Sequence, residues 1–153
     1  KPELEKQAAD MAPSGVHFVP PQPPEAMAPL MAAADLQLVT LKDDPLFRIT
    51  MPSKVQSILA SGRPLLVCAP GDAARVARDA GAGFSCEPGE PKRLADTIHR
   101  ALQCSQGELE RMGDKAVCYY ESYMAESIGA VRLTSLLSAA IRSNHLDGQE
   151  HGD

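Results

Sequence analysis

The fold is decided by residues 52–69, which read Pro52-Ser53-Lys54-Val55-Gln56-Ser57-Ile58-Leu59-Ala60-Ser61-Gly62-Arg63-Pro64-Leu65-Leu66-Val67-Cys68-Ala69. A helix is expected at the start of this stretch, because Ser53 and Gln56 fit a capping box and Gly62 ends the pattern. The apolar run over 64–69 is typical of a strand that is buried on both faces of a parallel sheet. A helix that leads directly into such a strand predicts an α/β fold.

The same alternation continues on both sides of this stretch. Further strands are expected at 16–19, 36–41 and 84–86, and helices at 3–12, 25–34, 72–80, 91–102 and 107–141. The helix over 25–34 is expected to be buried, the segment 42–51 to be a polar loop, and the terminal helical tract to break near Cys118. A second capping box pairs Ser105 with Glu108. This order predicts a Rossmann-like parallel sheet with helices on both faces.

Length and composition limit the classes of protein that fit. The chain has 153 residues, which suits one domain. We expect residues 1–142 to form its body, with terminal helices over about 107–142, and 143–153 to be a polar tail. A formal net charge of -5 and an aromatic content of 4% argue against a nucleic-acid partner. The four cysteines form no C-x-x-C pair, so we expect no metal site and reduced thiols, as in the cytosol. No apolar run approaches the ~18 residues of a membrane-spanning helix.

The best candidate for a ligand site is the helix start at Pro52, Ser53 and Lys54. Ligands of parallel α/β folds bind beyond the carboxyl ends of the strands, and this helix follows the strand expected at 36–41. Free backbone N–H groups at a helix start suit a phosphate, and Lys54 would add a full positive charge. The alternative is that Ser53 only caps its own helix.

Two further pairs of residues follow expected strands. Asp43 and Asp44 could bind a metal ion or a sugar hydroxyl or, alternatively, form a solvated turn. Gly71 would let the backbone come close to a ligand, and Asp72 could accept hydrogen bonds from that ligand or cap the helix that it opens. Cys68 lies inside an apolar run and is expected to be a core residue rather than a nucleophile.

Residues 52–66 resemble a segment of the family 4 glycosyltransferases with the GT-B fold, in which P-S-K and a hydrophobic residue precede A-S-G-R/K-P and a second hydrophobic residue. Other stretches agree with that family in order and spacing, namely Val16-His17-Phe18, the segment 27–35 ending in Ala34-Asp35, the segment 71–83, and Glu87-Pro88-Gly89-Glu90-Pro91. The resemblance covers about 16–140. It is nearest to enzymes of the capsule, O-antigen and colanic-acid type, including those similar to N-acetylfucosamine transferases.

The resemblance implies the C-terminal half of a GT-B enzyme, which binds a nucleotide-diphosphate sugar. It implies that Pro52, Ser53 and Lys54 lie at the diphosphate, and that Asp72, preceded by Gly71, lies near the sugar. It singles out no catalytic residue. It also implies that this chain starts in the helix after the second strand of that domain, so that the first two strands and the acceptor half lie outside it.

The same resemblance implies contacts to the nucleoside. Phe18 and Val19 would lie near the base. The acidic pair that many family members carry falls on Ile49 and Ser57, so both acids are absent and Ser57 takes the ribose-facing position.

The function that the resemblance implies is a hexosyltransferase-type glycosyltransferase that uses a UDP-sugar and no cofactor. It would serve polysaccharide synthesis in the bacterial cell envelope, in the cytoplasm or at the inner membrane surface, where a lipid-linked acceptor would lie. The isolated chain is expected to be inactive. Two alternatives stay open: a non-catalytic α/β binding or interaction module, and a GT-B-type epimerase, which the lack of paired acid–base carboxylates disfavours.

Overall fold

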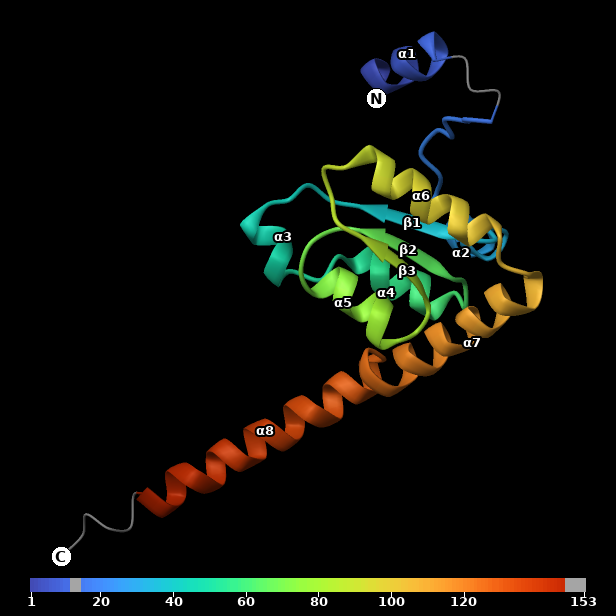
Figure 1. Ribbon diagram of the computed structural model, residues 1–153. Coiled ribbons are helices and arrows are strands. Elements are labelled where there is room, and N and C mark those ends of the chain that lie inside the picture. Colours follow the sequence, from blue (N-terminus) through green and yellow to red (C-terminus); the bar gives the residue numbers. More distant parts are fainter. Residues whose placement is uncertain (12–14, 148–153) are drawn as a thin grey trace, which may run out of the picture.

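The computed structural model describes residues 1–11 and 15–147, and a parallel sheet flanked by helices forms its centre (Figure 1). In chain order the elements are α1 (Pro2–Asp10), α2 (Pro24–Ala32), β1 (Gln37–Thr40), α3 (Pro45–Ile49), α4 (Ser53–Ala60), β2 (Leu65–Cys68), α5 (Asp72–Asp79), β3 (Gly83–Cys86), α6 (Pro91–Leu102), α7 (Gln106–Tyr123) and α8 (Glu126–Asp147). The predicted α/β class is confirmed.

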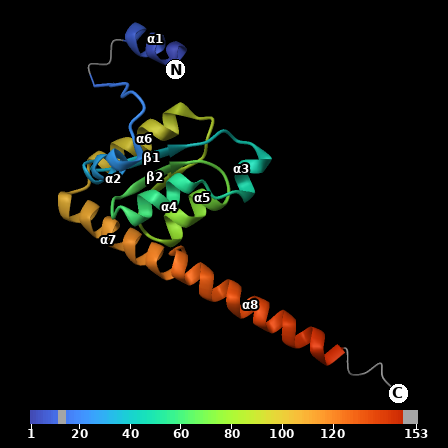
Figure 2. The same ribbon diagram turned by 180° about the vertical axis from the view of Figure 1, so that it is seen from behind.

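The sheet has the strand order β1-β2-β3, and all neighbouring strands are parallel. Val67 of β2 lies opposite Val39 of β1 and Ser85 of β3. Right-handed crossovers between consecutive strands place their helices on the same face. Figure 2 shows α4 and α5 on that face, in front of the sheet, while Figure 1 shows α6 on the opposite face. Because the strands are parallel, their carboxyl ends lie at the same end of the sheet, and α4, α5 and α6 begin there.

The core lies between the sheet and the helices α4 and α5. Leu59, Leu65 and Val67 are fully buried there, and burial of each such side chain contributes about 1.5–3 kcal/mol. Helix α7 packs against α4 on the outside of this layer. A side chain at Gly113 of α7 would collide with the carbonyl group of Gly62, so a glycine is needed where the two helices meet.

The opposite face of the sheet is less evenly covered. Leu66 is fully buried, and α6 packs over β3. Leu38 on β1 is 49% exposed, although it lies on a strand of the same sheet. The most complete packing is therefore around β2, which is the strand with neighbours on both sides.

The segment after α1 differs from its prediction. Residues 16–19 are extended, but they form no strand, and Phe18 and Val19 are 40% and 56% exposed. An apolar and β-prone run becomes a strand only where a neighbouring strand offers its backbone, and this segment has no such neighbour among the described residues. It leads instead into α2, which precedes the amino end of β1 (Figure 1).

Two short helices also differ from their predictions. No residue of α2 is buried, so the prediction of a buried helix at this place is wrong. Pro29 and the apolar residues around it in the helix lie at the surface. The segment 42–51 is not wholly a loop, because α3 forms within it. Asp44 caps α3 by accepting a hydrogen bond from the N–H of Leu46 at 2.8 Å, and Pro45 occupies the first helical position, where it needs no N–H.

The terminal helical tract breaks at Met124 and not near Cys118. The N–H groups of Met124 and Ala125 both donate to the carbonyl oxygen of Tyr120, at 2.8 and 2.9 Å, and Met124 leaves the helical conformation. Helix α8 then continues through Asp147, five residues into the segment expected to be a tail; the rest of that tail, 148–153, lies outside the described residues.

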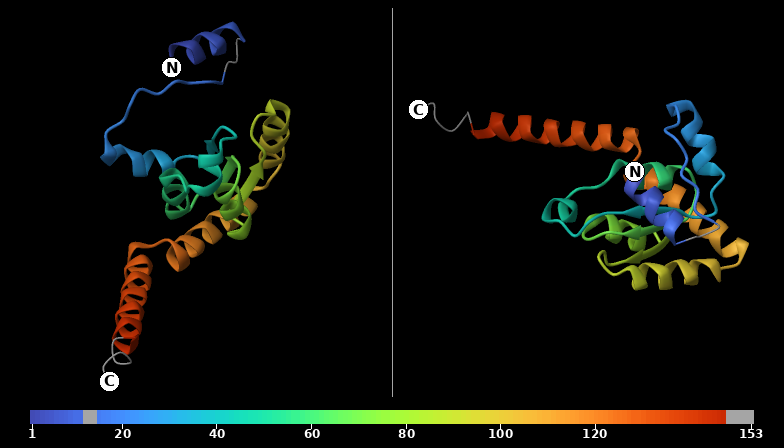
Figure 3. Two further views of the ribbon diagram at one scale, coloured as in Figure 1. Left: turned by 90° about the vertical axis from the view of Figure 1, so that its left-hand side faces the viewer. Right: turned by 90° about the horizontal axis from the view of Figure 1, so that it is seen from above.

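Helix α8 extends away from the rest of the protein (Figure 3). Its apolar side chains are exposed, with Val131 at 65% and Leu136 at 69%. By length and composition alone, the helical stretch Gln106–Arg142 is apolar enough to cross a membrane. A single helix that meets this criterion is weak evidence for a membrane span.

Candidate functional site

The candidate site lies at the end of the sheet where the carboxyl ends of the three strands meet. A cavity of about 620 Å³ opens there, between the end of β1 and the start of α6. Thr40, Lys42 and Asp43 line it from the side of β1, and Glu90 from the side of α6. The cavity floor is formed by Cys68, the last residue of β2.

The start of α4 is open to solvent at this end of the sheet. Ser53 and Lys54 are exposed, and the residue that caps the helix is Pro52, which has no side-chain donor or acceptor. The first N–H group that finds a partner is that of Val55, which donates to the carbonyl oxygen of Pro52 at 3.0 Å. The N–H groups of Ser53 and Lys54 belong to the first turn, in which a helix offers no internal acceptor. The start of α4 therefore presents two free backbone donors and an ammonium group.

The predicted capping box of Ser53 and Gln56 is wrong. Ser53 stands inside the helix, one position after the cap, and its hydroxyl makes no capping hydrogen bond. Within the described residues, the one side-chain hydrogen bond at Ser53 is made to its backbone: the hydroxyl of Ser57 donates to the carbonyl oxygen of Ser53 at 3.2 Å. The alternative role of Ser53, to satisfy its own helix, is thereby removed, and its hydroxyl stays available for a ligand.

The two aspartates after β1 have structural partners. Asp44 caps α3, as described above, and Asp43 accepts from the guanidinium of Arg48 at 2.6 Å. The interpretation of this pair as a turn former is therefore confirmed for Asp44. Both groups in the Asp43–Arg48 pair are more than half exposed, so the pair orders the surface of the loop and adds little stability.

The start of α5 lies against α3 on one side, although Gly71 itself is exposed. Gly71 caps this helix with a φ of 69°, which favours glycine, and a side chain at this position would run into the backbone of Arg48 in α3. The close approach that was expected toward a ligand is therefore made by α3. Asp72 is the first residue of the helix and not its cap, and its carboxylate accepts from Arg75 at 2.9 Å.

Cys68 is a buried residue of the sheet, as predicted. It is 7% exposed, and its thiol donates a weak hydrogen bond to the carbonyl oxygen of Glu87 at 3.6 Å. Burial first, and then the neighbouring thiol of Cys86, raise the pKa of the Cys68 thiol to about 11. At neutral pH the group is a thiol and not a thiolate, so it is a poor nucleophile.

The structure brings only some of the predicted site residues together. Pro52, Ser53 and Lys54 lie at one helix start, and Ser57 follows one turn later on the exposed side of the same helix. Phe18 and Val19 lie on the extended segment that leads into α2, which enters β1 from its amino end, opposite the edge where α4 begins.

Sequence reasoning missed Lys42 and Glu90, two charged residues that line the cavity. A signal for them existed, since Lys42 directly follows one expected strand and Glu90 stands four residues after another, in the segments where ligands of parallel sheets bind. Within the described ranges, no group of three or more His, Cys, Asp or Glu side chains is arranged to hold a metal ion.

Comparison with known proteins gives the family. Residues 1–104 match the family described as glycosyl transferases group 1. That match includes every strand of the sheet and the starts of α4, α5 and α6. No curated protein matches the chain. Because the family match covers well over half of the chain, the protein belongs to the group 1 glycosyltransferases, whose general activity is glycosyl transfer.

Proposed function

We propose that the chain binds a nucleotide-diphosphate sugar, with the diphosphate at the start of α4. The observation that carries this proposal is the open helix start. Among the described residues, the N–H groups of Ser53 and Lys54 have no internal acceptor, and both side chains are exposed at the end of the sheet where ligands of parallel α/β folds bind. A diphosphate suits this place because the helix start carries a partial positive charge.

These groups would also act in the reaction. When a glycosyl group is transferred from its donor, negative charge builds up on the departing diphosphate. Fixed donors and a cation next to that charge stabilise the transition state more than the ground state. Lys54 and the backbone N–H groups of α4 are the residues of this chain that could supply such stabilisation.

The remaining donor contacts extend the proposal. Ser57 faces solvent one helical turn from Ser53 and would approach the ribose, and Asp72, preceded by Gly71, would accept from sugar hydroxyls. The cavity of about 620 Å³ at this end of the sheet has room for the sugar and offers Lys42 and Glu90 as further polar groups. Contacts of Phe18 and Val19 with the base stay a prediction.

As to substrates, we propose a UDP-hexose or UDP-N-acetylhexosamine as donor and a polysaccharide or lipid-linked glycan as acceptor, as in the colanic-acid, O-antigen and N-acetylfucosamine-transferase group. Acceptor binding is proposed to need a second half of the enzyme. A lipid-linked acceptor would bring the bacterial enzyme from the cytoplasm to the inner membrane surface.

Calorimetric titration of the chain with UDP and with UMP tests the diphosphate site. We expect UDP to bind more tightly than UMP, because only UDP supplies the second phosphate. The variant Lys54→Ala should weaken UDP binding by about 1–3 kcal/mol, the scale of one charge-assisted hydrogen bond. Lys115→Ala is the matched control, since Lys115 lies on α7 beside Gly81, at the amino end of β3.

The outcomes separate the proposal from its alternative. Equal affinities of UDP and UMP, or an unchanged affinity in Lys54→Ala, would remove the diphosphate from the start of α4. No heat with either nucleotide at millimolar concentration would favour a non-catalytic binding or interaction module.

A further inference from the structure

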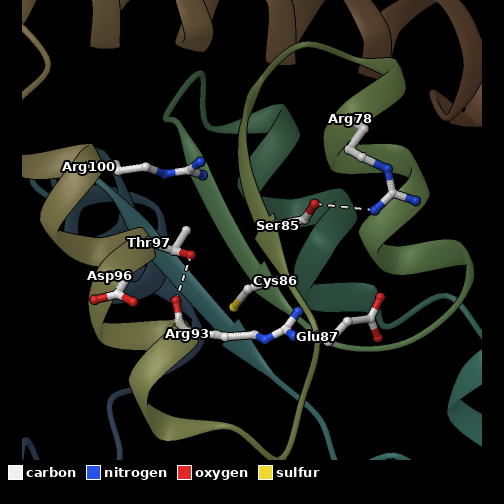
Figure 4. A pocket seen from close by; sticks show the side chains of 8 residues that line it. All are labelled: Arg78, Ser85, Cys86, Glu87, Arg93, Asp96, Thr97 and Arg100. Atoms are coloured by element: carbon white, nitrogen blue, oxygen red, sulfur yellow. Dashed lines mark hydrogen bonds between the residues drawn. The ribbon is translucent and has the colours of Figure 1, made fainter.

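A second cleft runs along the outer side of β3, between α5 and α6 (Figure 4). Its volume is about 400 Å³, and none of its lining residues belongs to the cavity at the strand ends. Three arginines line it: Arg78 from α5, and Arg93 and Arg100 from α6. Ser85 and Cys86 of β3 lie between them, so the cleft follows the edge of the sheet.

The backbone of β3 is open on this side. The N–H of Leu65 in β2 donates to the carbonyl oxygen of Ala82, so Ala82 turns its backbone carbonyl toward β2. In a parallel strand the facing residues alternate, so Phe84 also turns its N–H and C=O toward β2, while Ser85 turns both away. Over the ranges 1–11 and 15–147, β3 pairs with β2 alone. Its outer groups can therefore pair with one more strand.

Two guanidinium groups stand on opposite faces of this open edge. Arg78 donates to the hydroxyl of Ser85 at 3.2 Å, and the guanidinium of Arg100 lies 5.8 Å from the centre of the Phe84 ring. Both partners are neutral. In the described part of the chain neither arginine has an ion pair, whereas Arg93 bonds to Glu90 at 2.6 Å. Arg78 and Arg100 are thus held in place but not neutralised.

The acids of the cleft only partly balance its arginines. Asp96 is bonded to Lys92 at 2.9 Å. Glu87, which follows the last residue of β3, also lines the cleft and makes no ion pair among the described residues. Three arginines against Glu87 and Asp96 leave the cleft with a net positive charge, and in the described part of the chain Arg78 and Arg100 are the two of these arginines without an ion pair.

We propose that the β3 edge binds an acidic, extended segment of a partner protein as an additional strand. Neighbouring side chains of a strand point to opposite faces, so two adjacent acidic residues would reach Arg78 on one face and Arg100 on the other. The outward N–H and C=O of Ser85 would hold the backbone of that segment, and the two guanidinium groups its carboxylates.

Charge also decides between this partner and a second copy of the chain. Pairing of two β3 edges would bring the arginines of one copy against those of the other. Charged side chains on an edge strand commonly prevent such pairing. The same charges that repel a second copy attract an acidic strand, which makes the edge selective.

The test uses fluorescence anisotropy with the full chain and a labelled peptide in which pairs of glutamates alternate with single valines. We expect this peptide to bind, and Arg78→Gln and Arg100→Gln each to weaken it about tenfold, as the loss of one charge-assisted bond would. Arg111→Gln on α7 is the matched control and should leave the affinity unchanged, since Arg111 is exposed and lies outside the cleft. The titration with UDP is independent of this result, because the cleft shares no residue with the start of α4.

Three outcomes would overturn the proposal. Equal binding of a peptide with glutamine in place of glutamate would exclude the arginines as its partners. Equal binding of a peptide with prolines in place of the valines, or full competition by pyrophosphate, would indicate a simple anion site without strand addition. No binding by the parent chain, together with self-association of the Arg78→Gln/Arg100→Gln variant in sedimentation, would mean that the arginines only protect the edge.

Discussion

Two junctions of the protein can be compared, one between β1 and α4 and the other between β2 and α5. They connect elements of the same kind in different surroundings. Each joins a strand of four residues to a helix of eight residues at the same edge of the sheet. After β2 the chain turns through Ala69 and Pro70, both buried, and Gly71 packs under α3. After β1 the chain runs through a mostly exposed segment that contains the short helix α3 before it reaches the open start of α4.

This difference separates a structural junction from a functional one. Both helix starts carry free N–H groups and a partial positive charge. Helix α3 contacts the start of α5 at Gly71, although Gly71 itself is exposed, and so limits the approach of a ligand there. Burial at β2 thus fixes the sheet, and the exposed segment after β1 leaves the start of α4 open for the diphosphate that we propose to bind there.

The largest effect is expected at the junction between β2 and α5, from Gly71→Ala. The new side chain would collide with the backbone of Arg48, and the φ of 69° is unfavourable for alanine. We expect a loss of about 3 kcal/mol or more in the free energy of unfolding, measured with urea. Gly89→Ala is the control, because Gly89 has a φ of 87° with no atom within 4 Å of an added Cβ, and should lose only about 1 kcal/mol. Similar losses in both variants would mean that α3 does not press on α5.

A second effect concerns the buried end of β2 at high pH. Folding raises the pKa of the Cys68 thiol from 9.0 to about 11, so the folded state holds its proton more tightly than the unfolded state does. The stabilising contribution is complete below pH 9 and is lost as the pH rises toward 11. Urea midpoints should therefore fall over this range, and they should fall less in Cys68→Ala. Cys118→Ala, at an exposed position, should behave as the parent does; an identical pH profile in Cys68→Ala would contradict the assignment.

A third effect distinguishes two serines that the sequence presents alike. Ser105 is part of a complete capping box with Glu108, and the hydrogen bonds from Ser105 lower the pKa of that carboxyl group. Ser53 makes no capping bond. Ser105→Ala should cost about 1 kcal/mol of unfolding free energy, and Ser53→Ala should cost a few tenths at most while weakening UDP binding. The contribution of the Ser105 box should fade below pH 4.5, when Glu108 becomes protonated. A loss of about 1 kcal/mol of unfolding free energy in Ser53→Ala would instead mean that the Ser53 hydroxyl caps α4.

Sequence reasoning succeeded where the signal is local and failed where it depends on neighbours. The run at 64–69 was sufficient to predict β2, because a buried parallel strand must be apolar on both faces. The box of Ser105 and Glu108 was predicted correctly from spacing, but the same spacing at Ser53 and Gln56 misplaced the cap by one residue. Spacing cannot show which residue leaves the helical conformation first.

The strand predicted at 16–19 failed for a related reason. Its side chains favour a strand, yet a strand exists only with a partner, and no local pattern reports the partner. The candidate site was predictable as an edge of the sheet and as the start of α4. Its cavity residues Lys42 and Glu90 each follow an expected strand, but the sequence does not show that these two segments, far apart along the chain, line one cavity in the fold.

The smallest effect tests whether Asp72, at the junction between β2 and α5, can still serve a ligand. Its ion pair with Arg75 has a good distance of 2.9 Å, but both groups are largely exposed, so water competes for each of them. A double-mutant cycle with Asp72→Asn and Arg75→Gln should give a coupling energy of a few tenths of a kcal/mol, and salt should reduce it further. A pair this weak can be exchanged for a sugar hydroxyl at little cost. A coupling energy above about 1 kcal/mol would instead make Asp72 a fixed part of α5, and the sugar contact would then have to come from the cavity beside β1.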